Sequence, residues 1–219
     1  MALGEDTVKL ELFYDIVSPY SYLALTTLDR YRATTWPQLE LVLRPAFLGG
    51  VMKAVGNVPP ATLPQRAPYL LRDIARLSRH IGVEMTLPEV FPGQTLPTMR
   101  FLRVIDDEGD QKLLLAVTLA LYRAHWGRGE AVDTPDAMLR AAKEAGVDEP
   151  RAQAWLAKIG DADVKERLKA AGDEAVNRGA FGFPAMFVNK DGDDELFFGH
   201  DRISLLAAEM GLPWQGHRP

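Results

Sequence analysis

Residues 8–45 read VKLELFYDIVSPYSYLALTTLDRYRATTWPQLELVLRP, and this stretch decides the fold. Residues 8–14 alternate apolar and polar side chains before they turn fully apolar, which predicts a strand. Residues 20–31 carry apolar side chains at helical spacing, and residues 39–45 alternate again. The order of strand, helix and strand indicates a βαβ unit.

The helix of this unit is predicted to begin at Ser18-Pro19. Serine is a preferred N-cap because its side-chain oxygen accepts a backbone N–H of the first turn. Proline suits the first helical position because the N–H that it lacks would have no helical partner there. On local sequence alone, Ser18 is a cap that stabilises the helix by about 1 kcal/mol.

The remainder of the chain is mostly helical until strand signals return near its end. Residues 47–62 contain glycines and a Pro-Pro pair, which predict a loop or short helical turns. Further helices are expected at residues 66–81, 98–105, 113–126, 135–145, 149–159 and 163–178. Residues 185–189 and 195–198 suit a β-hairpin whose turn spans 190–194, and a last helix is expected over 201–210. The chain is thus predicted to be α/β, with one unit formed by residues 1–60 and 178–219 around an inserted helical domain, 61–177.

The composition excludes several classes of protein. The chain has 219 residues and no cysteine, which rules out disulfide scaffolds, cysteine-ligated metal sites and cysteine nucleophiles. The net charge of −5 gives no basic field for nucleic acid. The most apolar stretch, 113–122, is about half as long as the ~20 residues of a membrane span. No targeting signal is visible, so we expect an intracellular protein, with mitochondrion, peroxisome and cytoplasm not distinguished.

Four short clusters could carry chemistry, although each has an ordinary structural interpretation as a cap, a turn or a loop. They are SPYS at 18–21, GNVPP at 56–60, GAFGFP at 179–184 and FGHDR at 198–202. His80, His125 and His217 show no spacing typical of metal ligands or catalytic triads, and we expect them to be structural or exposed. We expect no metal site.

The order of the clusters is more informative than any one of them. A thioredoxin-type βαβ/ββα fold places Cys-x-x-Cys where this chain has residues 18–21, and it keeps a proline before its third strand, where Pro184 stands. The chain therefore resembles a thioredoxin-fold protein whose redox cysteines are serines. Such a protein cannot exchange disulfides with its own side chains, but it could bind the thiol of a ligand.

A more specific resemblance runs from about Val8 to Trp214. The chain is similar to the kappa-class glutathione transferases, whose relatives include the glutathione-dependent 2-hydroxychromene-2-carboxylate isomerases. The motifs that carry it are LFYD at 12–15 with SPYS at 18–21, MK at 52–53 with GN at 56–57 and PP at 59–60, MRFL at 99–102, GAFG at 179–182 with Pro184, and FG at 198–199 with DR at 201–202.

The resemblance implies a thioredoxin-like homodimer with a large all-helical insertion, and it implies glutathione as co-substrate. Ser18 would donate a hydrogen bond to the glutathione sulfur, and Tyr20 would form a wall beside it. Asn57 would hold the peptide from the side of the insertion. The remaining implied contacts are Pro19, Phe183 before a cis Pro184, and His200 with Asp201 at the γ-glutamyl end, with Arg66 as a weaker candidate.

Two positions depart from the family pattern, and three functions stay open. His200 stands where the family commonly has serine, and Phe183 stands where it commonly has a smaller aliphatic residue.

The favoured function is transfer of glutathione to small electrophiles, with possible reduction of organic hydroperoxides. The alternatives are a glutathione-dependent 2-hydroxychromene-2-carboxylate isomerase and a glutathione-binding module without turnover.

Overall fold

A four-stranded sheet lies at the centre of the computed structural model, which describes residues 7–190 and 193–218. Its strands are β1 (Val8–Tyr14), β2 (Leu39–Pro45), β3 (Ala185–Lys190) and β4 (Asp193–Phe198), in the spatial order β2-β1-β3-β4. β1 is parallel to β2 and antiparallel to β3. The prediction that residues 39–45 and 185–189 share one sheet is confirmed, while residues 191 and 192 of the predicted hairpin turn lie outside the described part of the chain.

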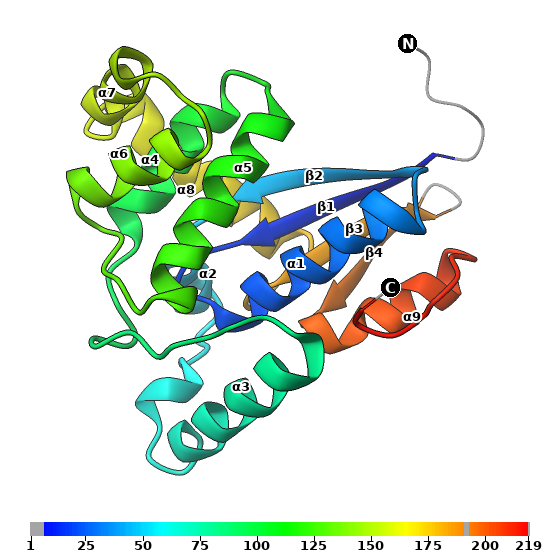
Figure 1. The fold of residues 1–219 in the computed structure, drawn as a ribbon. Coiled ribbons are helices and arrows are strands. Elements are labelled where there is room, and N and C mark those ends of the chain that lie inside the picture. Colours follow the sequence, from blue (N-terminus) through cyan, green and yellow to red (C-terminus); the bar gives the residue numbers. More distant parts are fainter. Residues whose placement is uncertain (1–6, 191–192, 219) are drawn as a thin grey trace.

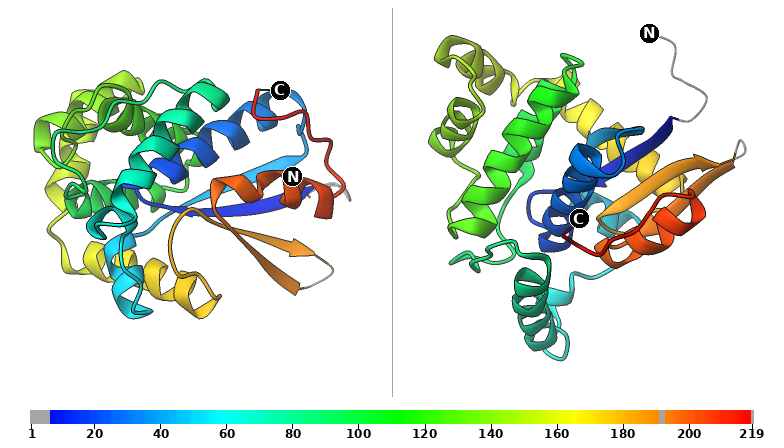
Figure 2. Two further views of the ribbon diagram at one scale, coloured as in Figure 1. Left: turned by 90° about the horizontal axis from the view of Figure 1, so that it is seen from below. Right: turned by 45° about the vertical axis from the view of Figure 1, so that its right-hand side comes forward.

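Helices cover both faces of the sheet (Figures 1 and 2). On one face lie α1 (Pro19–Thr34) and α9 (Ile203–Glu209), and on the other lie α2 (Leu48–Ala54) and α8 (Ala162–Asn177). Alternation along β1 explains this arrangement, because successive side chains of a strand point to opposite faces. Leu12 belongs to the main core with α1, whereas Phe13 packs edge-on against Phe187 in a second cluster on the side of α2 and α8.

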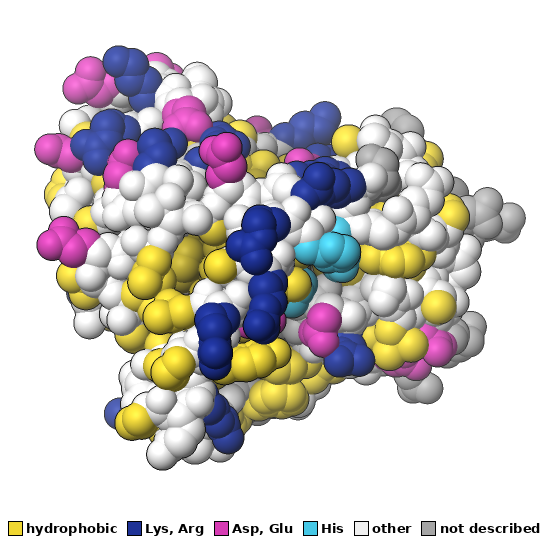
Figure 3. Space-filling model, turned by 60° about the horizontal axis from the view of Figure 1, so that its bottom comes forward, with side chains coloured by type: hydrophobic (Ala, Val, Ile, Leu, Met, Phe, Trp, Pro, Cys, Tyr) yellow, Lys and Arg dark blue, Asp and Glu magenta, His cyan; other side chains and the backbone are white. Residues whose placement is uncertain are grey.

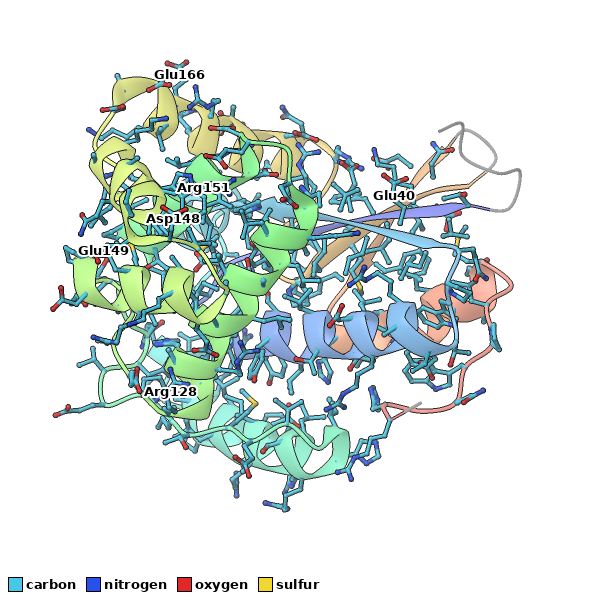
Figure 4. The ribbon with its side chains drawn as sticks, turned by 45° about the horizontal axis from the view of Figure 1, so that its top comes forward. Glu40, Arg128, Asp148, Glu149, Arg151 and Glu166 are labelled. Atoms are coloured by element: carbon cyan, nitrogen blue, oxygen red, sulfur yellow. The ribbon has the colours of Figure 1, made fainter. Side chains whose placement is uncertain are left out.

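The inserted helices α4 (Leu96–Asp106), α5 (Gln111–Tyr122), α6 (Pro135–Glu144) and α7 (Glu149–Lys158) form a block beside β2, with the short helical turn η2 (Arg123–Gly127) (Figure 1). The inserted helix α3 (Ala67–Ile81), preceded by the short turn η1 (Pro60–Thr62), lies apart from this block and contacts α1. Each predicted helix of this region is present. Thr134 caps α6, Asp148 caps α7 and Asp110 caps α5, each by accepting backbone N–H groups of the first turn. Figure 4 shows Asp148, Glu149 and Arg151 together at the start of α7.

Two elements differ from the expectation in detail. Residues 47–62 include a true helix, α2, although Gly49 and Gly50 within it lower its intrinsic propensity. The last helix begins with a tighter turn, η3 (His200–Arg202), and becomes α-helical only at Ile203. Gly199, at φ 96°, allows the chain to enter that turn sharply from β4.

An ion-pair network ties the sheet to α8. Arg178, just after α8, contacts Glu11 of β1 at 2.9 Å, Glu174 at 3.2 Å and Asp194 of β4 at 2.6 Å. Its guanidinium also lies 4.0 Å from the centre of the Phe187 ring. Charge pairing and stacking therefore join one helix end to two strands.

No helix within residues 7–190 and 193–218 is long and apolar enough to cross a membrane. The same residues contain no group of three or more histidine, aspartate or glutamate side chains placed to hold a metal ion.

Candidate active site at the start of α1

Ser18 occupies the junction between β1 and α1, as predicted. Its backbone is extended, with φ −87° and ψ 113°, and Pro19 is the first residue of the helix. The Ser18 Oγ accepts a hydrogen bond from the Ser21 N–H at 3.1 Å and donates one to the Phe183 carbonyl at 3.2 Å. Both serines of the motif are buried, with Ser18 4% exposed and Ser21 fully buried.

The segment before β3 faces this cap. The Phe183–Pro184 bond is cis, which confirms the prediction made for it. The Phe183 ring belongs to the core cluster beneath α2 and α8, while its carbonyl accepts from Ser18. The Gly199 N–H donates to the Pro184 carbonyl at 3.0 Å. Three of the four sequence clusters therefore meet here, although Ser18 and Phe183 alone are 165 positions apart.

Tyr20 and His200 form one wall of the site. Their rings are stacked, with centroids 5.3 Å apart and planes 11° apart, and the Tyr20 hydroxyl donates to Asp73 of α3 at 2.8 Å. Burial raises the pKa of Tyr20, and the Asp73 carboxylate raises it further, so Tyr20 stays a phenol at neutral pH. Burial lowers the pKa of His200, so this ring is neutral there.

Asn57 and Asp201 are both exposed. The Asn57 Nδ2 donates to the Phe181 carbonyl at 2.8 Å, which links the segment after α2 to the cluster at 179–184. The Asp201 carboxylate pairs with the adjacent Arg202 at 2.7 Å. Arg66 is exposed at the start of α3.

Asp15 is a feature of the site that the sequence analysis did not single out. This carboxylate is completely buried and accepts hydrogen bonds from the Val17 N–H at 3.0 Å, the Leu48 N–H at 2.8 Å and the Thr95 hydroxyl at 2.7 Å. It thereby joins the end of β1 to the starts of α2 and α4. Burial raises the pKa of Asp15 to about 6, against the opposing effect of those three hydrogen bonds.

The turn between Asp15 and Ser18 is held from behind by two aromatic side chains. The Tyr122 hydroxyl donates to the Asp15 carbonyl at 3.0 Å, and the Trp126 Nε1 donates to the Ile16 carbonyl at 2.9 Å. Both come from the inserted helices, so the insertion fixes the backbone that presents Ser18. A charged residue directly after a buried strand was the available sequence signal for Asp15.

The surface on this side of the molecule carries histidine, basic and apolar side chains. Figure 3 shows histidine side chains near the middle of this face, with Lys and Arg side chains and apolar patches around them. His217 lies near His80 and His200, at ring-centroid distances of 5.3 and 6.4 Å. The sequence expectation that His80 and His217 are structural or exposed agrees with these contacts, and His125 is buried.

The arrangement suits a thiolate supplied by a ligand. The N-terminus of a helix carries unpaired N–H groups and the positive end of the helix dipole, which favour an anion. In proteins, such positions lower the pKa of a cysteine thiol from ~8.5 to about 3.5–7.5. The chain has no cysteine, so a thiolate at this position would have to belong to a ligand.

Comparison with known proteins agrees with this fold and site. The chain matches the family model described as a DsbA-like thioredoxin domain over residues 9–211. It is 39% identical to glutathione S-transferase kappa 1 of Rattus norvegicus, over 99% of this chain and 97% of that protein. It is 37% identical to glutathione S-transferase kappa 1 of Homo sapiens, over 96% of this chain and 94% of that protein. A solved 2-hydroxychromene-2-carboxylate isomerase superposes with a TM-score of 0.80 at 24% identity, covering 93% of this chain and 94% of the other.

The fold and the site define a DsbA-like thioredoxin domain in which serine replaces the redox cysteines. At this identity, over nearly the whole of both chains, the chain belongs to the kappa class of glutathione transferases.

Proposed function

We propose that the protein transfers glutathione to small electrophiles, using a glutathione thiolate held at the start of α1. The observation that carries the proposal is the position of the Ser18 hydroxyl, which caps α1 and faces the carbonyl before cis Pro184. Membership of the kappa class supports it.

The chemistry follows from this geometry. When glutathione binds, its sulfur would replace the Phe183 carbonyl as the acceptor of the Ser18 proton. A hydrogen bond to the charged form lowers the pKa of the thiol, and the helix terminus acts in the same direction. The thiolate then attacks the electrophile, a new carbon–sulfur bond forms, and the displaced group leaves with the bonding electron pair. Ser18 itself is not a covalent nucleophile in this scheme.

The remaining contacts would hold the peptide. The backbone of Phe183 would pair with the cysteinyl residue, and Asn57 would hold the peptide from the side of the insertion. The exposed Asp201 carboxylate can meet the γ-glutamyl ammonium. His200 is buried and neutral, so its contribution would be the wall that it forms with Tyr20.

The experiment that tests this function is a pair of turnover assays on the purified protein with glutathione. Conjugation of 1-chloro-2,4-dinitrobenzene, abolished or strongly reduced in Ser18→Ala, is the expected result. Isomerisation of a hydroxychromene carboxylate without conjugation would favour the second function, that of a glutathione-dependent isomerase. Glutathione binding without turnover in either assay would indicate the third function, a glutathione-binding module. Cumene hydroperoxide as a third substrate tests reduction of organic hydroperoxides.

We also propose that the protein is a homodimer. Exposed apolar side chains support this, because exposed apolar patches on proteins often mark an interface. They include Tyr69 and Leu71 on α3 and the packed pair Phe181 and Phe198. Light scattering should give twice the mass of one chain, and a monomer at micromolar concentration would contradict the proposal.

A further inference from the structure

A cavity of about 460 Å³ lies between α2, α4 and α8. Its floor is apolar and is formed by Phe47, Val51, Leu96, Leu168 and Val176. None of the residues proposed to contact glutathione lines it. Small-molecule sites in proteins usually have volumes of about 300–1,000 Å³ and mostly apolar walls, so this cavity has the size and character of a ligand site.

Basic side chains surround the apolar floor. Lys53 of α2, Arg100 of α4, and Lys165 and Lys169 of α8 all line the cavity, together with one acid, Asp173. Lys169 is paired with Asp173, and this carboxylate raises the pKa of Lys169. Glu166, also on α8, is labelled at the outer edge of the helical block in Figure 4 and is absent from the cavity lining.

The other three cations have no such partner. Within residues 7–190 and 193–218, no ion pair is formed by Lys53, Arg100 or Lys165. Moreover, the Nε of Arg100 is buried without any hydrogen-bond partner in that part of the chain. A buried donor without a partner is costly, and most buried polar atoms in folded proteins are satisfied. Arg100 is thus a cation at the cavity for which the described residues supply no counter-charge.

The wall formed by α8 is open at Gly172. Glycine in the interior of a helix is less favourable than alanine, because it loses more backbone freedom on folding. A Cβ atom built on Gly172 would lie 3.5 Å from Val51 Cγ2, which is ordinary van der Waals contact. The packing therefore accommodates a methyl group here, and the glycine leaves that space free at the cavity wall.

We propose that this cavity binds a small amphiphilic carboxylate, with an aliphatic or aromatic body on the apolar floor and its carboxylate against Arg100. Lys53 and Lys165 supply further positive charge at the rim. A carboxylate can accept two hydrogen bonds from one guanidinium, which suits the planar arginine fork. A highly charged ligand such as a nucleotide fits poorly, because the floor offers it no polar groups. The site lies outside the proposed glutathione contacts and does not depend on the proposed function.

Calorimetry of the full chain with decanoate tests the proposal, with decanol as the uncharged probe of equal chain length. We expect decanoate to bind one site per chain and to bind at least tenfold more tightly than decanol. Arg100→Gln should weaken decanoate binding at least tenfold, because a charge-assisted hydrogen bond is lost. Gly172→Leu should abolish binding of both probes by filling the cavity. Lys143→Gln, which removes an exposed charge from α6, is the matched control and should have no effect.

Three results of the binding measurements would overturn the proposal. The first is absence of decanoate binding at millimolar concentration. The second is equal loss of affinity in Arg100→Gln and Lys143→Gln, which would indicate a general charge effect. The third is displacement of decanoate by glutathione, which would place the probe in the active site. Light scattering of Gly172→Leu provides a further check, because a change of oligomeric state would show that this cavity is covered by a second copy of the chain instead. Circular dichroism should first establish that both cavity variants are folded.

Discussion

The Tyr20 ring lies flat against the His200 imidazole, 5.3 Å from centroid to centroid, and its hydroxyl donates to Asp73 at 2.8 Å. This relationship joins the first turn of α1 to η3 and to α3. Because both burial and the Asp73 carboxylate raise the pKa of Tyr20, its phenol cannot act as a base at neutral pH.

Tyr20→Phe should therefore change stability more than chemistry. The phenyl ring keeps the stacking on His200, while the hydrogen bond to Asp73 is lost, at a cost of about 1–2 kcal/mol in the free energy of unfolding. The pH dependence of turnover should match that of the wild type. Denaturant titration and a pH–rate profile measure the two quantities, and a displaced profile would show that the phenol acts on the thiol.

Asn57 and Asp201 should determine affinity for glutathione. Changing either to alanine is expected to weaken binding by about 1–3 kcal/mol, the usual cost of losing a charged or buried hydrogen-bond partner. His200→Ser, which restores the residue common in the family, should have a smaller effect. Asp136→Ala, an exposed acid at the start of α6, is the control. Calorimetry that gives unchanged affinity for both alanine variants would contradict the proposed placement of the peptide.

Arg178 should contribute more to stability than an exposed arginine. Its side chain is 19% exposed and contacts Glu11, Glu174 and Asp194. Arg178→Ala therefore leaves Asp194 without this partner, and it leaves Glu11 and Glu174 with Arg44 as their shared cation. We expect a loss of about 2 kcal/mol or more in the free energy of unfolding. Arg167→Ala, which breaks exposed ion pairs with Asp107 and Asp163, should cost under about 1 kcal/mol. If urea titrations give equal losses in the free energy of unfolding for Arg178→Ala and Arg167→Ala, the Arg178 network contributes no more stability than exposed ion pairs do.

The sequence predicted the βαβ unit and the Ser18 cap because those features depend on local patterns. It also led to the cis Phe183–Pro184 bond, through the order of short motifs that fits a thioredoxin fold. The sequence did not predict α2 as a full helix, because the two glycines of α2 lower its intrinsic helix propensity. Its stability comes from the hydrogen bond to Asp15 and from packing against α8. Contacts such as Tyr20–Asp73 and Thr95–Asp15 join residues 53 and 80 positions apart, and no local pattern encodes them.

Asp15 should make stability fall as the pH rises from about 4 to 6. Its pKa is raised from 3.8 to about 6 in the folded chain, so over this interval the unfolded chain has already lost a proton that the folded chain still holds. The contribution of protonated Asp15 to the free energy of unfolding is fully present below about pH 4 and is lost as the pH rises to 6. The difference corresponds to about 3 kcal/mol.

Asp15→Asn removes this dependence. The free energy of unfolding of the variant, relative to the wild type, should rise by about 3 kcal/mol between pH 4 and pH 7. Thr95→Val provides the converse test, because it removes a hydrogen bond that lowers the pKa of Asp15 and should extend the fall in stability to higher pH. A relative stability of Asp15→Asn that stays constant with pH would show that this carboxylate titrates normally.

Substitution of Ser18 tests whether this residue, which caps α1, also donates a hydrogen bond to the glutathione thiolate. In the absence of ligand its proton is directed to the Phe183 carbonyl, and its oxygen accepts from Ser21. A cap without further function predicts that Ser18→Ala costs about 1 kcal/mol of stability and leaves turnover intact. Thr134→Ala is the matched control, because Thr134 caps α6 before a proline in the same way.

We expect the two variants to lose similar stability but to differ in chemistry. In Ser18→Ala the bound thiolate loses a hydrogen bond, so the pKa of the glutathione thiol should rise by about 1–2 units. Turnover should fall at neutral pH and recover at higher pH, where the thiol ionises without help. Affinity for S-methylglutathione should barely change, because that sulfur carries no charge. A pH–rate profile of Ser18→Ala that overlays those of the wild type and Thr134→Ala would show that the thiolate is stabilised by other groups.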